Sequence, residues 1–354
     1  MENETYISKM MRVLHKEDLS KEDIIFLLSL ERKDELESLY QYADRVRKEH
    51  LSDDVHIRGI LEFSNHCKND CLYCGIRRSN LNLDRYRLDK AQIIDLAKNA
   101  VDKLGFKTVL LQSGEDDCYT ADMIEEIIRG ILNECDCRVA LSIGERSIED
   151  YKRFFEAGAR RCLVRFETSN EKLYGSLHPN SSMTKNSFKE RIDLIKKFKQ
   201  IGYQVGTGSM IGLPGQTIED MADDILLAKQ LGADMVGMGP FLSHHDTPLF
   251  DCANGDFEMV LKMIAVTRLV CKDVFIPATT ALQTLNLANG RQLALGCGAN
   301  LLMPNITPGK YRRYYQLYPN KACIYEEPDD CSGCVKRLIL SVKRTIGTGY
   351  GDRA

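Results

Sequence analysis

Three cysteines on one short segment are the residues of this sequence whose types and spacing best suit chemistry. Cys67, Cys71 and Cys74 follow the pattern C-x3-C-x2-C directly after an apolar stretch at 57–63. Three thiolates on one loop can each bind a different iron of a cubane cluster, which leaves the fourth iron without a protein ligand. Because an open metal position is what a catalytic site requires, the spacing predicts a 4Fe-4S cluster that can take a further ligand.

A structural zinc ion is the alternative for the same cysteines. Such an ion needs a fourth protein ligand at similar spacing, and His66 is poorly placed to supply it because it is adjacent to Cys67. The pattern, with the aromatic Tyr73 directly before the last cysteine, also resembles that of the radical S-adenosylmethionine (SAM) superfamily. This resemblance implies that the open iron chelates the amino and carboxylate groups of SAM, with the aromatic ring beside the adenine.

The overall composition is that of a globular chain. The 354 residues are 44% hydrophobic and 28% charged, with a formal net charge of −3, so no global positive field favours nucleic acid. No apolar run approaches the ~20 residues that a membrane span needs, and the first residues are too charged for the core of a signal peptide. We therefore expect a cytoplasmic protein with no nucleic-acid partner and no membrane partner.

The chain contains thirteen cysteines. In a reducing cytoplasm, clustered cysteines hold metal more often than they form disulfides. A second cluster, Cys323, Cys331 and Cys334, lies near the C-terminus. The other seven are scattered along the chain, and we expect most of them to be small buried apolar residues.

The hydrophobic pattern changes near residue 53. Residues 4–50 carry apolar side chains at helical spacing, whereas from residue 55 short apolar strands alternate with helices. The expected strands lie near 57–63, 107–112, 138–143, 162–167, 204–210, 234–240, 274–278 and 299–303. Eight strands separated by seven helices predict an α/β fold, a (βα)8 TIM-type barrel at 53–307. An N-terminal helical segment at 1–52 and a C-terminal extension at 308–354 would flank it.

The expected fourth strand carries charge on one of its faces. Because side chains alternate along a strand, Cys162, Val164 and Phe166 suit packing against the outer helices. The residues left facing the interior are Arg161, Leu163, Arg165 and Glu167. Barrel interiors are normally filled by branched apolar residues, and buried charge is costly unless it is paired or bound to a ligand. A structural Arg165–Glu167 ion pair is one interpretation, and we favour a site for a charged ligand, with which such a pair can coexist.

Longer segments resemble one family within the superfamily, the HydE-type radical SAM maturases of FeFe-hydrogenase. The resemblance covers about residues 50–335 and includes EFSNHCKNDCLYCGIRRSN at 62–80, LLQSGED at 110–116, VRFETSN at 164–170, GTGSMIGLPGQT at 206–217, IPATTA at 276–281 and GANLLMPNITPGKYRRYYQLYP at 298–319. It implies a radical SAM barrel whose 4Fe-4S cluster is held by the three loop cysteines.

The resemblance also implies roles for residues that match the family's motifs. The expected SAM-binding residues are Tyr73, Ser113, Gly114, Glu115, Ser142, Glu167 and Arg191. The expected substrate-contacting residues are Arg161, Arg165, Thr279, Thr280 and Tyr315. One departure is Ala140, which stands where the family often has a threonine and leaves the ligand contact on that strand undefined.

The second cysteine cluster matches an auxiliary iron–sulfur site found in some members of the same family. The resemblance implies a second cluster, either 2Fe-2S or 4Fe-4S, held by Cys323, Cys331 and Cys334. A zinc site completed by another ligand and free thiols are the alternatives. We expect this cluster to lie far from the barrel cavity and assign it no catalytic role.

The family resemblance implies a reaction and partners. An external electron donor would reduce the cluster, SAM would be cleaved to methionine and a 5'-deoxyadenosyl radical, and the radical would act in assembly of the diiron subcluster of the hydrogenase H-cluster. The implied substrate is an organometallic iron–cysteine complex with carbon monoxide and cyanide, delivered by a partner maturase, with other hydrogenase maturation proteins as further partners.

Three other functions remain open on the sequence. A methylornithine synthase, a related radical SAM mutase acting on lysine, should offer a carboxylate for the lysine side chain. Biotin synthase fits less well, because that family has an Asn/His-rich segment where this chain reads Arg-Phe-Glu-Thr-Ser at 165–169. A non-catalytic iron–sulfur scaffold would need the cysteines but neither Glu167 nor Arg191.

Overall fold

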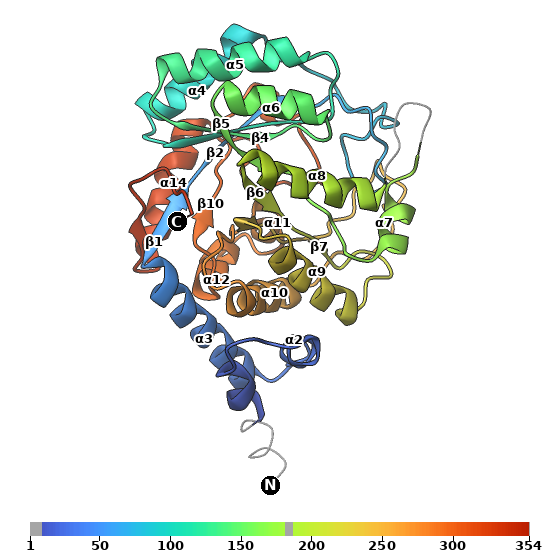
Figure 1. Ribbon diagram of the computed structural model, residues 1–354, viewed down its shortest axis with the longest axis vertical. Helices are drawn as coiled ribbons and strands as arrows, with labels where there is room; N and C mark the ends of the chain where they lie inside the picture. The colour runs from blue at the N-terminus through green and yellow to red at the C-terminus, as the bar shows by residue number, and fades with distance from the viewer. Residues whose placement is uncertain (1–8, 181–186, 354) are drawn as a thin grey trace.

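The computed structural model, which describes residues 9–180 and 187–353, contains a parallel sheet that curls into a barrel (Figure 1). Six strands are hydrogen-bonded in the order β2-β3-β4-β5-β6-β8. Their bounds are β2 Gly59–Ser64, β3 Thr108–Ser113, β4 Arg138–Ser142, β5 Ala159–Leu163, β6 Gln204–Thr207 and β8 Met235–Val236. Consecutive strands are parallel and lie side by side, as the alternating pattern of strands and helices predicts.

Short bridges close the remaining side of the barrel. Met235 on β8 pairs with Phe275, and Pro277 pairs with Leu301 on β10 (Leu301–Leu302). Strand β10 pairs in turn with β1 (Asp54–Ile57), which leads directly into β2. Ile306 N also donates to Ile60 O at 2.8 Å. The segment at 275–277 and strand β10 thus take the places of the seventh and eighth barrel strands. The predicted eight-stranded barrel fold is confirmed.

Amphipathic helices cover the outside of the barrel. Helix α5 (Ala121–Glu134) shows why: its buried residues are Ile124, Ile127, Ile128 and Ile131, which lie on one face at helical spacing. The Thr120 side chain caps its first turn by accepting from Met123 N. The other helices that follow barrel strands are α4 Lys90–Asp102, α6 Ile148–Glu156, α7 Glu171–Leu177, α8 Phe188–Ile201, α9 Ile218–Gln230, α10 Phe257–Val270, α11 Thr280–Leu285 and α12 Gly290–Gly296.

Several strands differ in extent from the sequence-based expectation. Strand β5 begins at Ala159 and ends at Leu163, whereas the pattern predicted a strand at 162–167. The stretch expected at 204–210 divides into β6 and β7 (Met210–Ile211) at Gly208, which has φ +149°. A Cβ on Gly208 would lie 1.9 Å from Gly237 O, so the two backbones approach more closely than any side chain would permit. The expected strand at 234–240 likewise divides into β8 and β9 (Gly239–Pro240).

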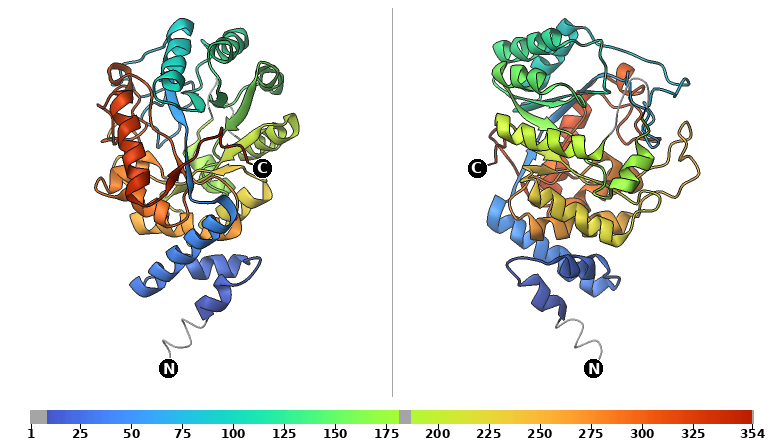
Figure 2. Two further views of the ribbon diagram at one scale, coloured as in Figure 1. Left: turned by 90° about the vertical axis from the view of Figure 1, so that its left-hand side faces the viewer. Right: turned by 45° about the vertical axis from the view of Figure 1, so that its right-hand side comes forward.

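The N-terminal helices lie against one side of the barrel's helical layer (Figure 2). Helix α2 (Lys21–Leu28) is tied to α9 by an ion pair between Lys21 Nζ and Asp223 Oδ2 at 2.6 Å. Helix α3 (Lys33–Leu51) lies against α10, where Tyr40 donates a hydrogen bond to Glu258. No helix among the described residues is both long and apolar enough to cross a membrane.

The C-terminal extension runs along the barrel from one end to the other. After α13 (Gly309–Arg312), the loop at 313–327 lies over the end where the cysteine loop emerges, with Gly75 N donating to Leu317 O at 2.9 Å. Helix α14 (Pro328–Ser341) then returns the chain to the opposite end, where β11 (Thr345–Ile346) pairs with β1. The final residues cross the N-terminal ends of the barrel strands.

Candidate active site

The cysteine loop emerges from the C-terminal end of β2, which is the end of a parallel barrel where active sites are built. Cys67, Cys71 and Cys74 are all partly accessible and none forms a disulfide. The loop is fixed by backbone hydrogen bonds, among them Lys68 N to Glu115 O at 2.9 Å and Leu72 N to Leu177 O at 2.9 Å. The structure thus presents three thiols of one loop at the mouth of the barrel.

The three thiols influence one another electrostatically. Burial, followed by the neighbouring Cys74 and Cys67, raises the pKa of Cys71 well above its usual value. Burial and Cys67 raise the pKa of Cys74 to about 12, and burial together with Glu115 raises that of Cys67. A bound cation reverses this preference, because coordinated thiols lose their protons. The donor set therefore fits a group that brings its own positive charge.

The spacing of the sulfurs argues against one zinc ion. Within the described ranges, the only group of three His, Cys, Asp or Glu side chains whose ligand atoms all lie within 4.8 Å of one another is His244, His245 and Asp246. With zinc–sulfur distances of 2.3 Å, the sulfurs of a tetrahedral site lie about 3.8 Å apart. The three loop cysteines do not form such a group, so at least one pair of their sulfurs lies more than 4.8 Å apart, which suits a multi-iron cluster that each cysteine joins through a different metal atom.

The loop after β3 packs directly beneath the cysteine loop. Gly114 N donates to Ser64 O at 3.1 Å, and a Cβ on Gly114 would lie 2.2 Å from His66 O and 2.7 Å from Cys67 Cβ. Only glycine fits there, which gives the Ser-Gly-Glu-Asp motif a steric reason. Ser113 donates its hydroxyl to Gly114 O at 2.7 Å.

Glu115 lies in the loop after β3, and Ser142 lies at the end of the next strand, β4. Ser142 ends β4 and is paired in register with Gln112 of β3. Burial raises the pKa of Glu115, which the nearby Arg191 partly offsets. Glu115 therefore contacts the cysteine loop directly, through the Lys68 N to Glu115 O bond, and Ser142 ends the strand beyond β3 at the same end of the barrel.

Tyr73 lies in a small apolar cluster beside that loop. The cluster is built on Leu177, Leu213 and Phe241, and the Tyr73 hydroxyl is 2.9 Å from His178 Nε2. Burial lowers the pKa of His178 to about 4, so its ring is neutral. An aromatic ring held in an apolar setting with one polar end is suited to lie against a flat heterocycle.

Glu167 occupies a strained turn just beyond β5. Its φ is +65°, which is unusual for a residue other than glycine. The turn is held on both sides, because Glu167 N donates to Gly208 O at 3.1 Å and Glu167 O accepts from Met210 N at 2.8 Å. Backbone strain that the surrounding hydrogen bonds maintain is typical of functional sites. It aims the Glu167 carboxylate toward Arg165, whose Nη2 lies 3.1 Å away.

Arg191 reaches the same region from helix α8. Its Nη1 donates to Arg165 O at 2.8 Å and its Nε to Glu145. Although burial opposes it, the pKa of Arg191 is raised by Tyr174, Glu145 and Glu115, so the guanidinium stays charged. Glu145 was not identified from the sequence, and its place in the loop after β4 offered no pattern that could have found it.

Three of the residues that the sequence assigned to substrate contact come from the start of α11 and from the C-terminal extension. Thr279 caps α11, and Thr280 Oγ1 accepts from Arg291 Nη2 at 2.9 Å. Tyr315 is buried, and burial raises its pKa well above the usual value, with Glu62 adding to the rise. Arg291 was missed in the sequence, because it lies on a helix rather than on a strand.

Several buried polar side-chain atoms in this part of the protein lack hydrogen-bond partners. Within the described part of the chain, the atoms without a hydrogen bond include Arg165 Nε, Arg291 Nε, Thr207 Oγ1 and Tyr174 Oη. Native interiors satisfy nearly all such groups. A cluster of unsatisfied donors at the mouth of a barrel therefore fits a site whose polar ligands complete it.

Arg161 differs from the sequence-based expectation. Its Nη2 donates to Tyr350 O at 2.8 Å, to Gly351 O at 2.9 Å and to Asp352 Oδ1 at 2.6 Å, while Nη1 and Nε bond to Thr108 and Gln204. These partners lie at the N-terminal end of the barrel and in the C-terminal tail. Arg161 therefore lies toward the N-terminal end of the barrel, because β5 begins three residues earlier than the pattern suggested, and its contact with substrate stays a prediction.

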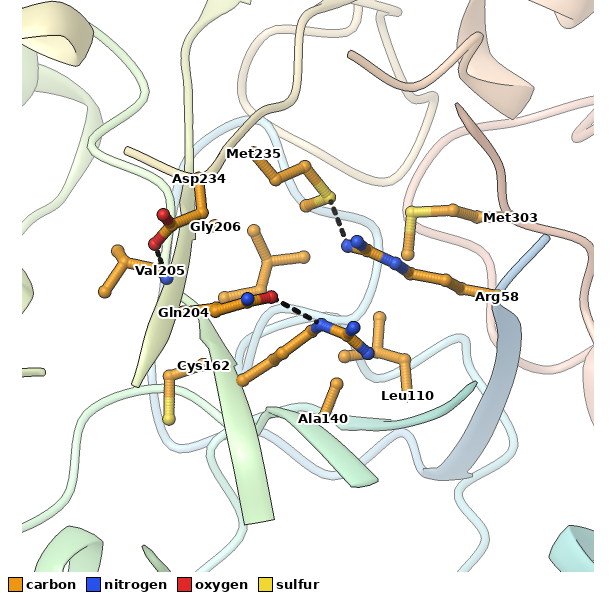
Figure 3. Close-up of a pocket in the computed structure, with 12 residues that line it drawn as sticks. Arg58, Leu110, Ala140, Cys162, Gln204, Val205, Gly206, Asp234, Met235 and Met303 are labelled. Carbon is orange, nitrogen blue, oxygen red and sulfur yellow. Dashed lines mark hydrogen bonds between the residues drawn. The ribbon is translucent and has the colours of Figure 1, made fainter. Parts of the chain in front are cut away.

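A narrow cavity of about 20 Å³ lies beside Arg161 inside the barrel (Figure 3). Ala140 lines it, together with Arg58, which donates to Gly351 O at 3.0 Å and lies 3.4 Å from Met235 Sδ. This volume holds about one water molecule, so the cavity is too small for an organic substrate. The Ala140 position, which the sequence left undefined, opens onto this inner cavity.

A buried ion pair inside the barrel was also missed. Lys321 Nζ lies 2.5 Å from Glu62 Oε1, and Asn305 Nδ2 donates to Glu62 Oε2 at 2.6 Å. The side chains of Lys321 and Glu62 are only 8% and 3% exposed. Glu62 lies on the inner face of β2, so the parity argument used for the fourth strand could have found it.

The second cysteine cluster lies closer to the barrel interior than expected. Cys323 follows Lys321 by two residues. The hydrogen bond with Cys331 lowers the pKa of Cys323, and burial opposes this shift only in part. Arg312 Nη1 lies 3.4 Å from Cys331 Sγ and donates to Cys323 O at 2.8 Å. Cys334 is exposed one helical turn further along α14. The three cysteines are thus gathered at the junction of the loop and α14.

Comparison with known proteins agrees with this site. Residues 61–228 match the family model of the radical SAM superfamily. The chain is 44% identical to the [FeFe] hydrogenase maturase subunit HydE of Thermotoga maritima over 345 residues, covering 98% of this chain and 97% of the relative. It is 30% identical to 3-methylornithine synthase of Methanosarcina acetivorans over 82% of this chain and 81% of that protein. The crystal structure of methylornithine synthase (PylB) superposes with a TM-score of 0.83 at 29% identity, covering 96% of this chain and 97% of that chain.

Fold, cysteine loop and family match together define a radical SAM enzyme. The more specific relationship follows from the long match to the Thermotoga maritima maturase, which extends through the N-terminal helices and the C-terminal extension. The chain belongs to the HydE family of [FeFe]-hydrogenase maturases.

Proposed function

We propose that this protein cleaves SAM reductively at the cysteine loop and uses the resulting radical in assembly of the diiron subcluster of the [FeFe]-hydrogenase H-cluster. The observation that carries the proposal is the set of three neighbouring thiols at the barrel mouth, beside buried polar atoms without partners. Thiols alone would serve a scaffold, whereas the unsatisfied polar atoms call for a second ligand next to the cluster.

The residues of the loop would hold a 4Fe-4S cluster through Cys67, Cys71 and Cys74. When bound, this group supplies the electron that breaks the carbon–sulfur bond of SAM and releases a 5'-deoxyadenosyl radical. Tyr73 would lie against the adenine, while Gly114 and Glu115 would receive the methionine ammonium. Arg191, kept cationic by Glu145, would bind the carboxylate through charge-assisted hydrogen bonds.

The remaining cavity would bind the substrate. Arg165 is 31% exposed and retains a free Nε, and Arg291 lies opposite beside Thr280. Two guanidinium groups favour an anionic ligand. This fits an organometallic iron–cysteine complex carrying carbon monoxide and cyanide, delivered by a partner maturase in the cytoplasm. An external electron donor and other hydrogenase maturation proteins would complete the system.

Cys323, Cys331 and Cys334 would hold an auxiliary 2Fe-2S or 4Fe-4S cluster. The contact between Arg312 and Cys331 supports this assignment, because a guanidinium near the sulfurs offsets the negative charge of thiolates. Iron analysis of the anaerobically reconstituted C331A variant tests it. The variant should lose the iron of one cluster and keep its SAM cleavage, and unchanged iron content would contradict the assignment.

Two incubations separate the maturase from its nearest relative in function. Anaerobic protein with SAM, reductant and the synthetic iron–cysteine complex should consume the complex, with a new signal in electron paramagnetic resonance. The same protein with lysine and SAM should yield no methylornithine by mass analysis. Methylornithine formation, or 5'-deoxyadenosine formation that ignores the iron complex, would contradict the proposed role.

A further inference from the structure

Two carboxylates near the barrel mouth are each paired with a cationic side chain, whereas a third cation, Arg291, has no carboxylate partner among the described residues. Glu167 is paired with Arg165 at 3.1 Å, and Glu62 is paired with Lys321 at 2.5 Å. Arg291 has a hydroxyl partner, Thr280, and no carboxylate of the described residues forms an ion pair with it. The charge of Arg291 is therefore not cancelled by a carboxylate, whereas the charge of Glu62 is offset by Lys321.

Lys321 reaches Glu62 from the C-terminal extension that lies over the end of the barrel. It lies in the loop between α13 and α14, and the loop is anchored beside it by Ala322 N, which donates to Thr284 Oγ1 at 3.0 Å. Its ammonium also lies 5.4 Å from the centre of the Tyr315 ring and 3.4 Å from Tyr315 O. The Lys321 ammonium is thus held by a carboxylate, an aromatic ring and a carbonyl. The same three kinds of group would bind the ammonium of a cationic substrate.

The Lys321–Glu62 pair lies close to Arg291. Ala322 N donates to Thr284 Oγ1, Thr284 Oγ1 donates to Thr280 O at 3.0 Å, and Arg291 donates to Thr280 Oγ1. Tyr318 is partly buried in the same loop; burial raises its pKa, Glu62 adds to the rise, and Arg291 and Arg165 oppose it, so the ring lies near the carboxylate and both guanidinium groups. A ligand held by Arg165 and Arg291 would therefore lie close enough to Glu62 to be repelled by it, were Lys321 absent.

We propose that Lys321 is a specificity-determining residue, whose ammonium occupies the Glu62 carboxylate so that the cavity accepts an anionic ligand and rejects an amine. The inference rests on the proposed function, because it concerns the substrate of that same site. It assigns a reason for the buried pair, which as an isolated ion pair offers little stability over an apolar replacement.

The test compares two amino acids that differ only in side-chain charge, L-lysine and L-norleucine. Calorimetric dissociation constants would be measured at pH 8 on anaerobic holoenzyme with SAM bound. The wild-type protein, whose cavity rejects an amine, should bind lysine no more tightly than norleucine. The K321M variant keeps the length of the side chain and leaves Glu62 free, so it should bind lysine at least about 10-fold more tightly than norleucine.

Two further variants make the result decisive. E62Q/K321M removes both charges, so it should lose the preference for lysine and unfold thermally near the wild-type temperature. K336M makes the same substitution on α14, where Lys336 Nζ bonds to Leu104 O at 3.1 Å, and should leave both affinities unchanged.

Equal affinity of K321M for the two amino acids, or a lysine preference that persists in E62Q/K321M, would overturn the inference. 5'-Deoxyadenosine formation in the same wild-type sample tests the proposed function separately. If SAM is cleaved but the preference does not appear, only the role of Lys321 fails; if SAM is not cleaved, the proposed function fails.

Discussion

Arg161 and Arg165 come from one strand region and point into one barrel, yet the protein supplies different numbers of hydrogen-bond partners to them. Every donor-bearing nitrogen of Arg161 is bonded, three of the contacts being to the C-terminal tail. Arg165 bonds to Ser209 O and Glu167 and keeps Nε free among the described residues. An inward charge is therefore not itself a sign of ligand binding. What distinguishes the two ends is whether the protein supplies the partners.

The largest effect should separate the cysteine loop from the exposed thiol beside it. C71A should abolish cluster loading and SAM cleavage, because the remaining two loop sulfurs cannot hold the cubane. C118A is the control, since Cys118 is exposed in the neighbouring loop and carries no role in this account. Iron content and 5'-deoxyadenosine are measured for both. SAM cleavage by C71A would refute the site.

At the cysteine end, R165M should weaken the substrate site. Loss of one charge-assisted contact corresponds to about 2–3 kcal/mol, or up to about 100-fold in substrate affinity. KM for the iron–cysteine complex should rise, while the free energy of unfolding changes little because the side chain is partly exposed. An unfolding defect with unchanged KM would make Arg165 a structural residue like Arg161.

At the opposite end, R161M should act on stability. The side chain is 5% exposed and its partner Asp352 is 38% exposed, so solvent screening reduces the loss to about 2 kcal/mol. Denaturant unfolding of the anaerobic protein measures it, and SAM cleavage should persist. If stability stays unchanged while KM for the iron complex rises, the original expectation for Arg161 is restored and the comparison of the two ends fails.

The smallest effect concerns pH and His178. Its folded-state pKa of about 4 lies below the usual 6.5, so the unfolded chain binds more protons between these values and stability falls as pH falls through that window. Relative to pH 7.5, the loss at pH 5.5 should be about 1 kcal/mol. Chemical denaturation of H178Q should show a shallower pH dependence. Equal slopes for the two proteins would contradict the assigned pKa.

The sequence was sufficient for the fold and for which face of each strand is buried. Val164 and Phe166 are buried among apolar neighbours as predicted. The start of β5 along the barrel axis, in contrast, was not predicted correctly. A start at Ala159 in place of 162 shifts the frame by three residues, roughly 10 Å of strand. That shift places Arg161 nearer the N-terminal end of the barrel than the strand pattern suggested.

Contacts from distant segments were beyond sequence patterns. The tail at Tyr350–Asp352 reaches Arg161 across about 190 residues of chain, and Lys321 reaches Glu62 across 259. Such pairings depend on where the C-terminal extension runs, and no local periodicity encodes that path. Glu62 itself was accessible to the parity argument, since it lies on the inner face of the first long strand.

The central claim is that the three loop sulfurs leave one iron free for SAM. Electron–nuclear double resonance of the reduced holoenzyme with SAM labelled at its carboxylate and amino groups tests it directly. The account predicts hyperfine coupling between the cluster and the label in wild-type protein. Coupling that is absent although SAM is bound would mean that the sulfonium ligand does not reach the metal, which contradicts the account.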